Sequence, residues 1–147
     1  ALAIDPKSTL ANWFQGQLFF ARGEYSRAAE TLRSAMEISE NTTRFVADYA
    51  SALAMAGNRA ESLNLLGDLE TKFAAGSNVS LYESAIIHAA LGNLDQAFFH
   101  LEAALDARTW QVATMRVDLM RGPLRTDPRF SNLLLKAGFP ADAANSG

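Results

Sequence analysis

The stretch Ala56-Gly57-Asn58-Arg59 has counterparts at Arg22-Gly23-Glu24-Tyr25 and Leu91-Gly92-Asn93-Leu94. The three glycines lie 34 and then 35 residues apart. A fixed spacing of this size is typical of proteins built from repeated supersecondary units. Glycine also adopts the left-handed backbone that ends a helix at a tight turn. We therefore expect repeated helix pairs, each joined at one of these glycines.

The segments around the glycines have the apolar periodicity of helices. Apolar residues recur at helical spacing, as at Ala28, Leu32, Ala35 and Met36, and proline is absent between Pro6 and Pro123. Strict alternation of apolar and polar residues, which would favour strands, is hard to find. The sequence predicts an all-α chain with helix pairs at 9–21 with 25–38, 43–56 with 59–73, and 79–91 with 95–107.

Small and bulky residues recur in register with the glycines. The small positions are Gly16 and Ala28 in the first unit, Ala50 and Ser62 in the second, and Ala85 and Ala97 in the third. The bulky positions are Phe19 and Leu32 in the first unit, Leu53 and Leu66 in the second, and Leu101 in the third. This pattern resembles the tetratricopeptide repeat (TPR), although Asn12, Gln15, His88 and Glu40 depart from it. The resemblance implies a right-handed superhelix of helix-turn-helix repeats with C-terminal capping helices.

The same register divides the chain. We expect one TPR domain over 1–140, with repeats at 9–42, 43–77 and 78–108 and a helical cap at 109–140. Residues 141–147 are expected to form a disordered tail. Pro6 lies 34 residues before Glu40, so 1–6 is interpreted as the end of a preceding repeat. On that interpretation the chain is a fragment of a longer array, and its first helix has lost a neighbour.

The cap region has its own helix signals. Residues 108–121 form a helix-like run, and Asp127-Pro128 predicts a helix start with an acidic cap and proline in the first turn. Phe130, Leu133, Leu134 and Ala137 form an apolar stripe that Gly138 ends. This ending resembles the TPR tails of bacterial signalling proteins such as class III adenylate cyclases, winged-helix regulators and some protein kinases. The resemblance implies a C-terminal regulatory or interaction module with an effector domain upstream.

Composition narrows the function classes. A net charge of −3 without a basic stripe argues against a nucleic-acid partner. The sequence has no run of about 18 apolar residues that would span a membrane, so we expect no membrane contact. The absence of cysteine excludes disulfides and thiolate chemistry. It fits a reducing cytoplasm, with the periplasm as the alternative.

No residue constellation indicates catalysis. His88 falls on a core position and is expected to be packed and hydrogen-bonded, whereas His100 is expected to be solvated on the outer side of its helix. The two histidines lack the spacing of a helical metal motif, and no nucleophile elbow or phosphate loop is present. We expect no enzyme activity, no metal and no cofactor.

The resemblance implies that the first helix of each pair lines a concave groove. The family's groove positions fall on Trp13, Gln17, Phe20, Arg44, Ala47, Asp48, Ser51, Tyr82, Glu83 and Ile86. Only Arg44 is cationic, so the set lacks the basic pairs that clamp a carboxylate in chaperone-binding members. An aromatic and apolar groove suits an amphipathic helix or an extended peptide. Trp13 and Phe20 could equally face a missing repeat.

The predicted function is a non-catalytic protein-interaction module that binds a peptide or helix in this groove. The alternative is a self-association or intramolecular regulatory domain of a bacterial adenylate cyclase or transcriptional regulator. The expected partner is accordingly another protein or peptide, a second copy, or the upstream domain of the same chain.

Overall fold

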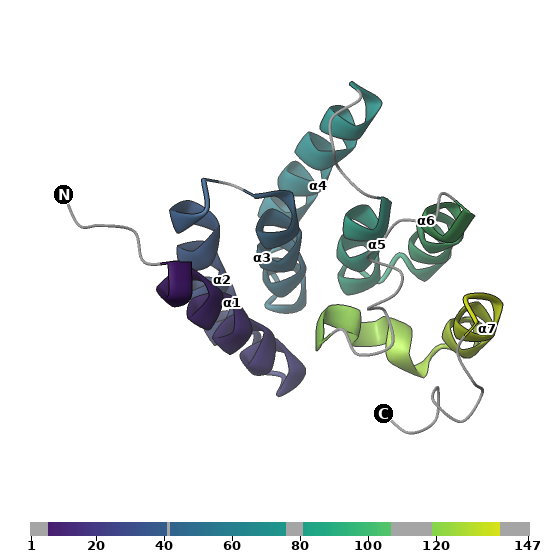
Figure 1. The fold of residues 1–147 in the computed structure, drawn as a ribbon, viewed down its shortest axis with the longest axis horizontal. Helices are drawn as coiled ribbons and strands as arrows, with labels where there is room; N and C mark the ends of the chain where they lie inside the picture. The colour runs from purple at the N-terminus through teal and green to yellow at the C-terminus, as the bar shows by residue number, and fades with distance from the viewer. Residues whose placement is uncertain (1–5, 41, 76–80, 107–118, 139–147) are drawn as a thin grey trace.

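The computed structural model describes residues 6–40, 42–75, 81–106 and 119–138, and these residues contain helices and turns but no strand. The helices are α1 (Pro6–Ala21), α2 (Tyr25–Ile38), α3 (Thr43–Met55), α4 (Arg59–Ala74), α5 (Leu81–Ala90), α6 (Leu94–Asp106), the 3-10 segment η2 (Leu119–Thr126) and α7 (Pro128–Lys136). Figure 1 shows their arrangement. The predicted all-α class is confirmed.

The three glycine turns share one backbone geometry. Gly23, Gly57 and Gly92 have φ values of 81°, 97° and 87°, a conformation that glycine adopts without steric cost. In each turn the N–H after the glycine donates to the carbonyl five residues earlier. These bonds are Glu24 to Phe19 at 2.9 Å, Asn58 to Leu53 at 2.8 Å and Asn93 to His88 at 2.9 Å. Such bonds satisfy carbonyls at the end of the first helix. The predicted helix pairs, joined at these glycines, are confirmed.

The helix pairs are stacked in chain order. Helix α3 packs mainly against α2 on one side, with a smaller contact to α1, and against α5 on the other, while α2, α4 and α6 also pack against the first helix of their own pair. The small residues of the register permit these close approaches, since a Cβ at Gly16 would lie 2.6 Å from Cγ of Leu32. Ala50 and Ala85 are fully buried. The packing role predicted for the small positions is confirmed.

The first helix begins earlier than predicted. Helix α1 starts at Pro6 instead of residue 9, because proline is well suited to the first helical position, where no intrahelical N–H bond is needed. Pro6 therefore opens α1 in the structure. The interpretation of residues 1–5 as the end of an earlier helix lies outside the described residues.

The C-terminal helix follows its sequence signals. Asp127 Oδ1 accepts a hydrogen bond from the Arg129 N–H at 2.9 Å, and Pro128 is the first residue of α7. Phe130, Leu133 and Leu134 are buried. The predicted helix start and apolar stripe are confirmed. The helix-like run before Leu119 and the predicted tail at 141–147 lie outside the described residues.

Between the helix pairs and α7 lies η2. This segment contacts α5 and α1, which belong to the third and first pairs. Leu124 is 1% exposed and belongs to the common apolar core. A Cβ at Gly122 would lie 3.5 Å from the ring of Phe20 on α1. The C-terminal part of the chain is therefore packed against the row of first helices.

Candidate interaction surface

A buried carboxylate is the centre of the polar contacts between the first two pairs. Asp48 on α3 is fully buried. Its Oδ2 accepts hydrogen bonds from Trp13 Nε1 at 2.6 Å and from Gln17 Nε2 at 3.1 Å, both on α1. Its Oδ1 accepts a hydrogen bond from Arg44 Nε at 2.9 Å, one turn earlier on α3. We call these four residues the Asp48 cluster.

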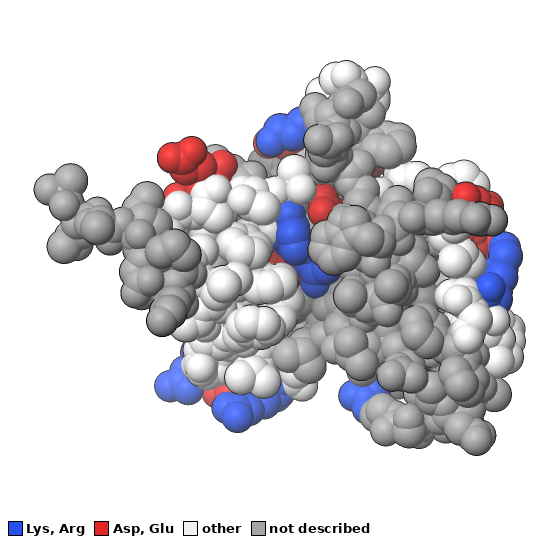
Figure 2. Space-filling view, in the orientation of Figure 1, with Lys and Arg blue, Asp and Glu red and all other residues white. Residues whose placement is uncertain are grey.

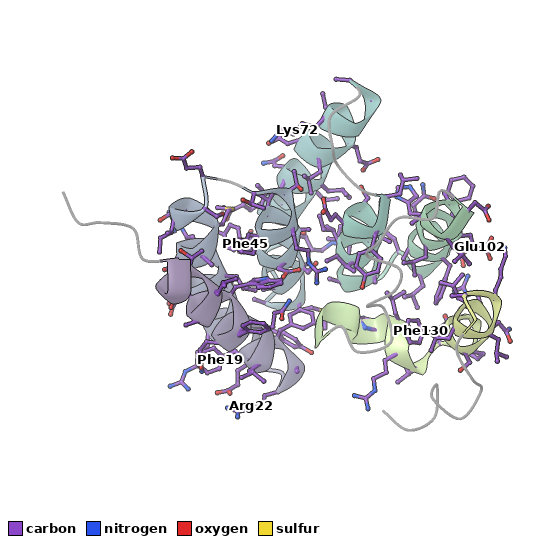
Figure 3. The ribbon with its side chains drawn as sticks, viewed as in Figure 1. Phe19, Arg22, Phe45, Lys72, Glu102 and Phe130 are labelled. Carbon is purple, nitrogen blue, oxygen red and sulfur yellow. The ribbon has the colours of Figure 1, made fainter. Side chains whose placement is uncertain are left out.

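Aromatic rings surround the cation of this cluster. The Arg44 guanidinium carbon lies 5.9 Å from the ring centroid of Trp13 and 5.6 Å from that of Tyr82 on α5. The Trp13 ring also packs against Phe45, with centroids 5.0 Å apart, and Figure 3 labels Phe45 on α3 next to α1. A guanidinium over an aromatic face is attracted by the ring quadrupole. One arginine thus joins side chains of all three first helices.

The ten predicted groove residues lie on the first helices α1, α3 and α5. Eight of them are buried: Gln17, Phe20, Ala47, Asp48, Ser51, Tyr82, Glu83 and Ile86. Trp13 and the side chain of Arg44 are partly buried. Most of the ten residues are therefore buried in the folded chain, and whether they bind a peptide stays a prediction.

The spacing of residues within each helix could not reveal that most of the predicted groove residues are buried. The groove prediction treats each first helix as having one free inner face. Asp48 instead points to donors on α1, and Ser51 donates its hydroxyl to the Ala47 carbonyl at 2.8 Å within its own helix. The side-chain donors Trp13 and Gln17 could have indicated this contact, because a buried carboxylate in the next helix pair needs hydrogen-bond donors.

The two histidines form a second buried cluster. The rings of His88 on α5 and His100 on α6 meet edge to face with centroids 5.0 Å apart. Both residues are buried, so the prediction that His100 is solvated is wrong. Its position fits the spacing Ala97, His100, Leu101, Ala104, which is the buried stripe of α6. That spacing could have indicated its burial.

Burial governs the protonation of this pair. Loss of solvation lowers the pKa of both imidazoles, and the neighbouring His100 lowers the pKa of His88 further. The Glu70 carboxylate opposes both shifts, with its Oε1 3.8 Å from Nε2 of His88. That distance is too long for a hydrogen bond. Within the described part of the chain, neither ring nitrogen of His88 has a hydrogen-bond partner, so the expected hydrogen-bonded histidine is not found there.

The described residues give little support to a metal site or to a ligand pocket. No group of three or more His, Asp or Glu side chains there could hold a metal ion. A shallow hollow is lined by Gly92, Asn93, Leu94, Asp95, Gln96 and Arg129. Its arginine is already paired, since Arg129 Nη1 donates to Asp95 Oδ1 at 2.7 Å and Nη2 donates to Asp127 Oδ2 at 3.0 Å.

None of the described helices is both long and apolar enough to cross a lipid bilayer.

Comparison with known proteins found no match to this chain. No family model matches the sequence, no curated protein matches it, and no solved structure matches its fold.

Proposed function

We propose that this chain is a non-catalytic protein-interaction module of the tetratricopeptide type, in which the row of α1, α3 and α5 binds a short apolar segment. The bacterial signalling tails that its sequence resembles suggest a regulatory role within a larger protein. The observation that carries the proposal is the packing of η2 against α1 and α5. A row of helices that accepts one segment of its own chain offers the shape and apolarity to accept another.

The Asp48 cluster supports this role by holding the row rigid. Its donors come from α1 and its cation from α3, and Arg44 also contacts the Tyr82 ring on α5. A rigid surface loses little conformational entropy when a ligand binds, so more of the contact energy appears as affinity.

Leu124 suggests what a ligand must offer. This leucine of η2 is almost completely buried, while the next two residues, Arg125 and Thr126, are exposed. Burying a leucine side chain is worth about 1.5–3 kcal/mol. A ligand of this surface would accordingly present a single apolar anchor on a turn, and η2 would compete with it. If η2 competes with the ligand in this way, it regulates the surface from within the chain, which is the intramolecular alternative given in the sequence analysis.

A peptide experiment tests the proposal. A fluorescein-labelled peptide of residues 119–127 is titrated with the full chain and with the full-length Leu124→Ala variant, and fluorescence anisotropy is recorded. We expect the peptide to bind the variant more tightly than the wild type, because the competing internal segment has lost its anchor. A peptide that itself carries Leu124→Ala should bind roughly tenfold or more weakly, given the value of a buried leucine.

The chain offers a matched control for the variant. Leu135 on α7 is about half exposed, so Leu135→Ala removes the same atoms without releasing η2. Circular dichroism confirms that both variants remain helical. Absence of peptide binding to every protein, or equal binding of the two peptides, would contradict the proposal.

A further inference from the structure

An apolar stripe runs along the outside of α1. Leu10, Phe14 and Leu18 are 48%, 54% and 42% exposed and follow one another at intervals of four residues. Residues at this spacing lie on one face of a helix. The other large apolar side chains that are exposed in the described chain, Leu63, Phe99 and Leu135, lie singly on α4, α6 and α7. The α1 stripe is therefore a patch and not scattered exposure.

The repeat register identifies this stripe as a face that receives a helix. Phe14 corresponds to Asp48 in the second pair and Glu83 in the third, at offsets of 34 and 35 residues. Both of those residues are buried, and Asp48 is buried by contacts with the preceding first helix, α1. Leu18 likewise corresponds to the buried residues Ala52 and Ile87. The α1 stripe thus continues the stacking interface seen inside the chain.

The absence of charged residues along α1 indicates which kind of partner can pack against the stripe. No charged residue occurs from position 8 to 21, although the chain as a whole has a net charge of −3. Figure 2 shows a largely uncharged surface over α1. A second copy therefore meets this stripe without like-charge repulsion, and a charged partner gains no ion pair there.

The order of side chains also fits a second copy. The residue types at positions 10, 14 and 18 are Leu, Phe and Leu, so their order is the same in both chain directions. Two antiparallel copies related by a two-fold axis at Phe14 would place each leucine against the other leucine of the partner. Such a contact is isologous, so it closes and does not propagate. The Phe14 ring also contacts the ring of Trp13, with centroids 5.3 Å apart.

We propose that this chain forms a reversible homodimer through antiparallel packing of the Leu10–Phe14–Leu18 stripe on α1. A single helix pair buries less than the roughly 800 Å² per partner of a stable interface, so the dimer forms in a concentration-dependent way. The stripe is distinct from the buried Asp48 cluster, and this proposal does not depend on peptide binding.

The oligomeric state tests the proposal directly. Sedimentation velocity of the full chain, from micromolar to submillimolar concentration, should show the mass rise from 15.9 kDa toward twice that value. Phe14→Glu should keep the protein monomeric, because it places two carboxylates at the two-fold axis. Phe99→Glu alters a phenylalanine on α6 that is more exposed than Phe14, and it should leave dimerisation intact. A monomer at every concentration, or equal effects of the two variants, would overturn the proposal.

Three further variants test the geometry of the proposed dimer. Mixing Phe14→Glu with Phe14→Lys chains should restore a dimer, because opposite charges then meet at the axis. The chain has no cysteine, so Phe14→Cys introduces a single thiol, which should form an intermolecular disulfide under mild oxidation. Leu10→Cys should cross-link far less, since antiparallel packing places the two copies of residue 10 apart. Efficient cross-linking through residue 10 together with none through residue 14 would exclude the antiparallel arrangement.

Discussion

The indole Nε1 of Trp13 lies 2.6 Å from Oδ2 of Asp48, a residue 35 positions later in the chain. This hydrogen bond joins the first helix pair to the second, and it does so at a carboxylate with no exposed surface. Burial of a charge is tolerated only where partners replace the water that it has lost. The Trp13–Asp48 contact therefore makes the interface between the pairs depend on a complete polar cluster.

Replacing Asp48 with alanine should cause a large loss of stability. The change leaves the Arg44 cation without its carboxylate and the indole N–H of Trp13 without its acceptor. Removing one partner of a buried pair typically costs about 3–5 kcal/mol. Urea denaturation followed by circular dichroism measures the change. Asp48→Asn keeps an acceptor for Trp13 and should lose less.

An exposed ion pair provides the control for Asp48. Arg33 and Glu37 pair at 3.0 Å on α2, with about 60% of both side chains exposed. Exposed pairs contribute little to stability. Glu37→Ala should leave the urea midpoint almost unchanged. A similar loss in Glu37→Ala and Asp48→Ala would contradict the importance assigned to the buried cluster.

Two glycine-to-alanine changes should have opposite signs. At Gly16 a Cβ would approach Cγ of Leu32 to 2.6 Å, so Gly16→Ala overpacks the interface within the first pair and should destabilise the protein by about 1–3 kcal/mol. Gly67 lies within α4 with open space around it, so Gly67→Ala should stabilise the helix by roughly 0.5–1 kcal/mol. Thermal unfolding of the two variants measures both effects. Equal signs would contradict the close approach at Gly16.

Ser62 should tolerate alanine but not valine. Its hydroxyl donates to the Ala50 carbonyl at 2.8 Å, and the residue is fully buried where the other pairs have Ala28 and Ala97. Ser62→Ala removes a hydrogen bond worth about 1 kcal/mol or less net, since the Ala50 carbonyl remains an acceptor within α3. Ser62→Val adds volume and should cost about 1–3 kcal/mol. Urea denaturation of both variants tests the order, which a more stable valine variant would contradict.

Stability should fall as the pH drops below about 6.5. The pKa values of His88 and His100 are lower in the folded chain than their ordinary value of 6.5, chiefly because both rings are buried. Between the folded and ordinary pKa values, the unfolded chain binds more protons, so acid favours unfolding. The contribution is complete above pH 6.5 and is lost as the pH falls from there to the folded pKa values. Urea midpoints measured at a series of pH values test this dependence.

His100→Phe separates the histidines from other acid effects. A phenyl ring can keep the edge-to-face contact with His88 while removing one titrating group and the like charge beside it. The fall in stability between neutral pH and about pH 5 should be smaller than in the wild type. An unchanged pH profile would show that groups other than the two histidines dominate the acid response.

The sequence was informative about local structure because its signals are local. Gly57 predicts its turn because the required backbone conformation depends on one residue, and Asp127-Pro128 predicts a helix start for the same reason. The alanines predict close helix approach because their size alone permits it. These predictions did not depend on where distant segments lie.

The exposure of the candidate surface depends on distant contacts, so helix periodicity could not predict it. Tyr82 is on the predicted inner face of its helix, yet it is 1% exposed in the folded chain. The packing of η2 against α1 and α5 depends on the path of the C-terminal chain, which no repeat spacing describes. The prediction for His100 was wrong in the same direction, because a polar residue within an apolar stripe was expected to be solvated and is buried.

The Asp48 cluster also affects how the array opens. Repeat proteins with only nearest-neighbour apolar contacts can fray one unit at a time from an end. Here the first pair cannot detach without removing two of the donors to a carboxylate in the second pair. The amide protons of α1 and α3 should therefore exchange with solvent in one shared opening event, so that the two pairs behave as a single cooperative unit.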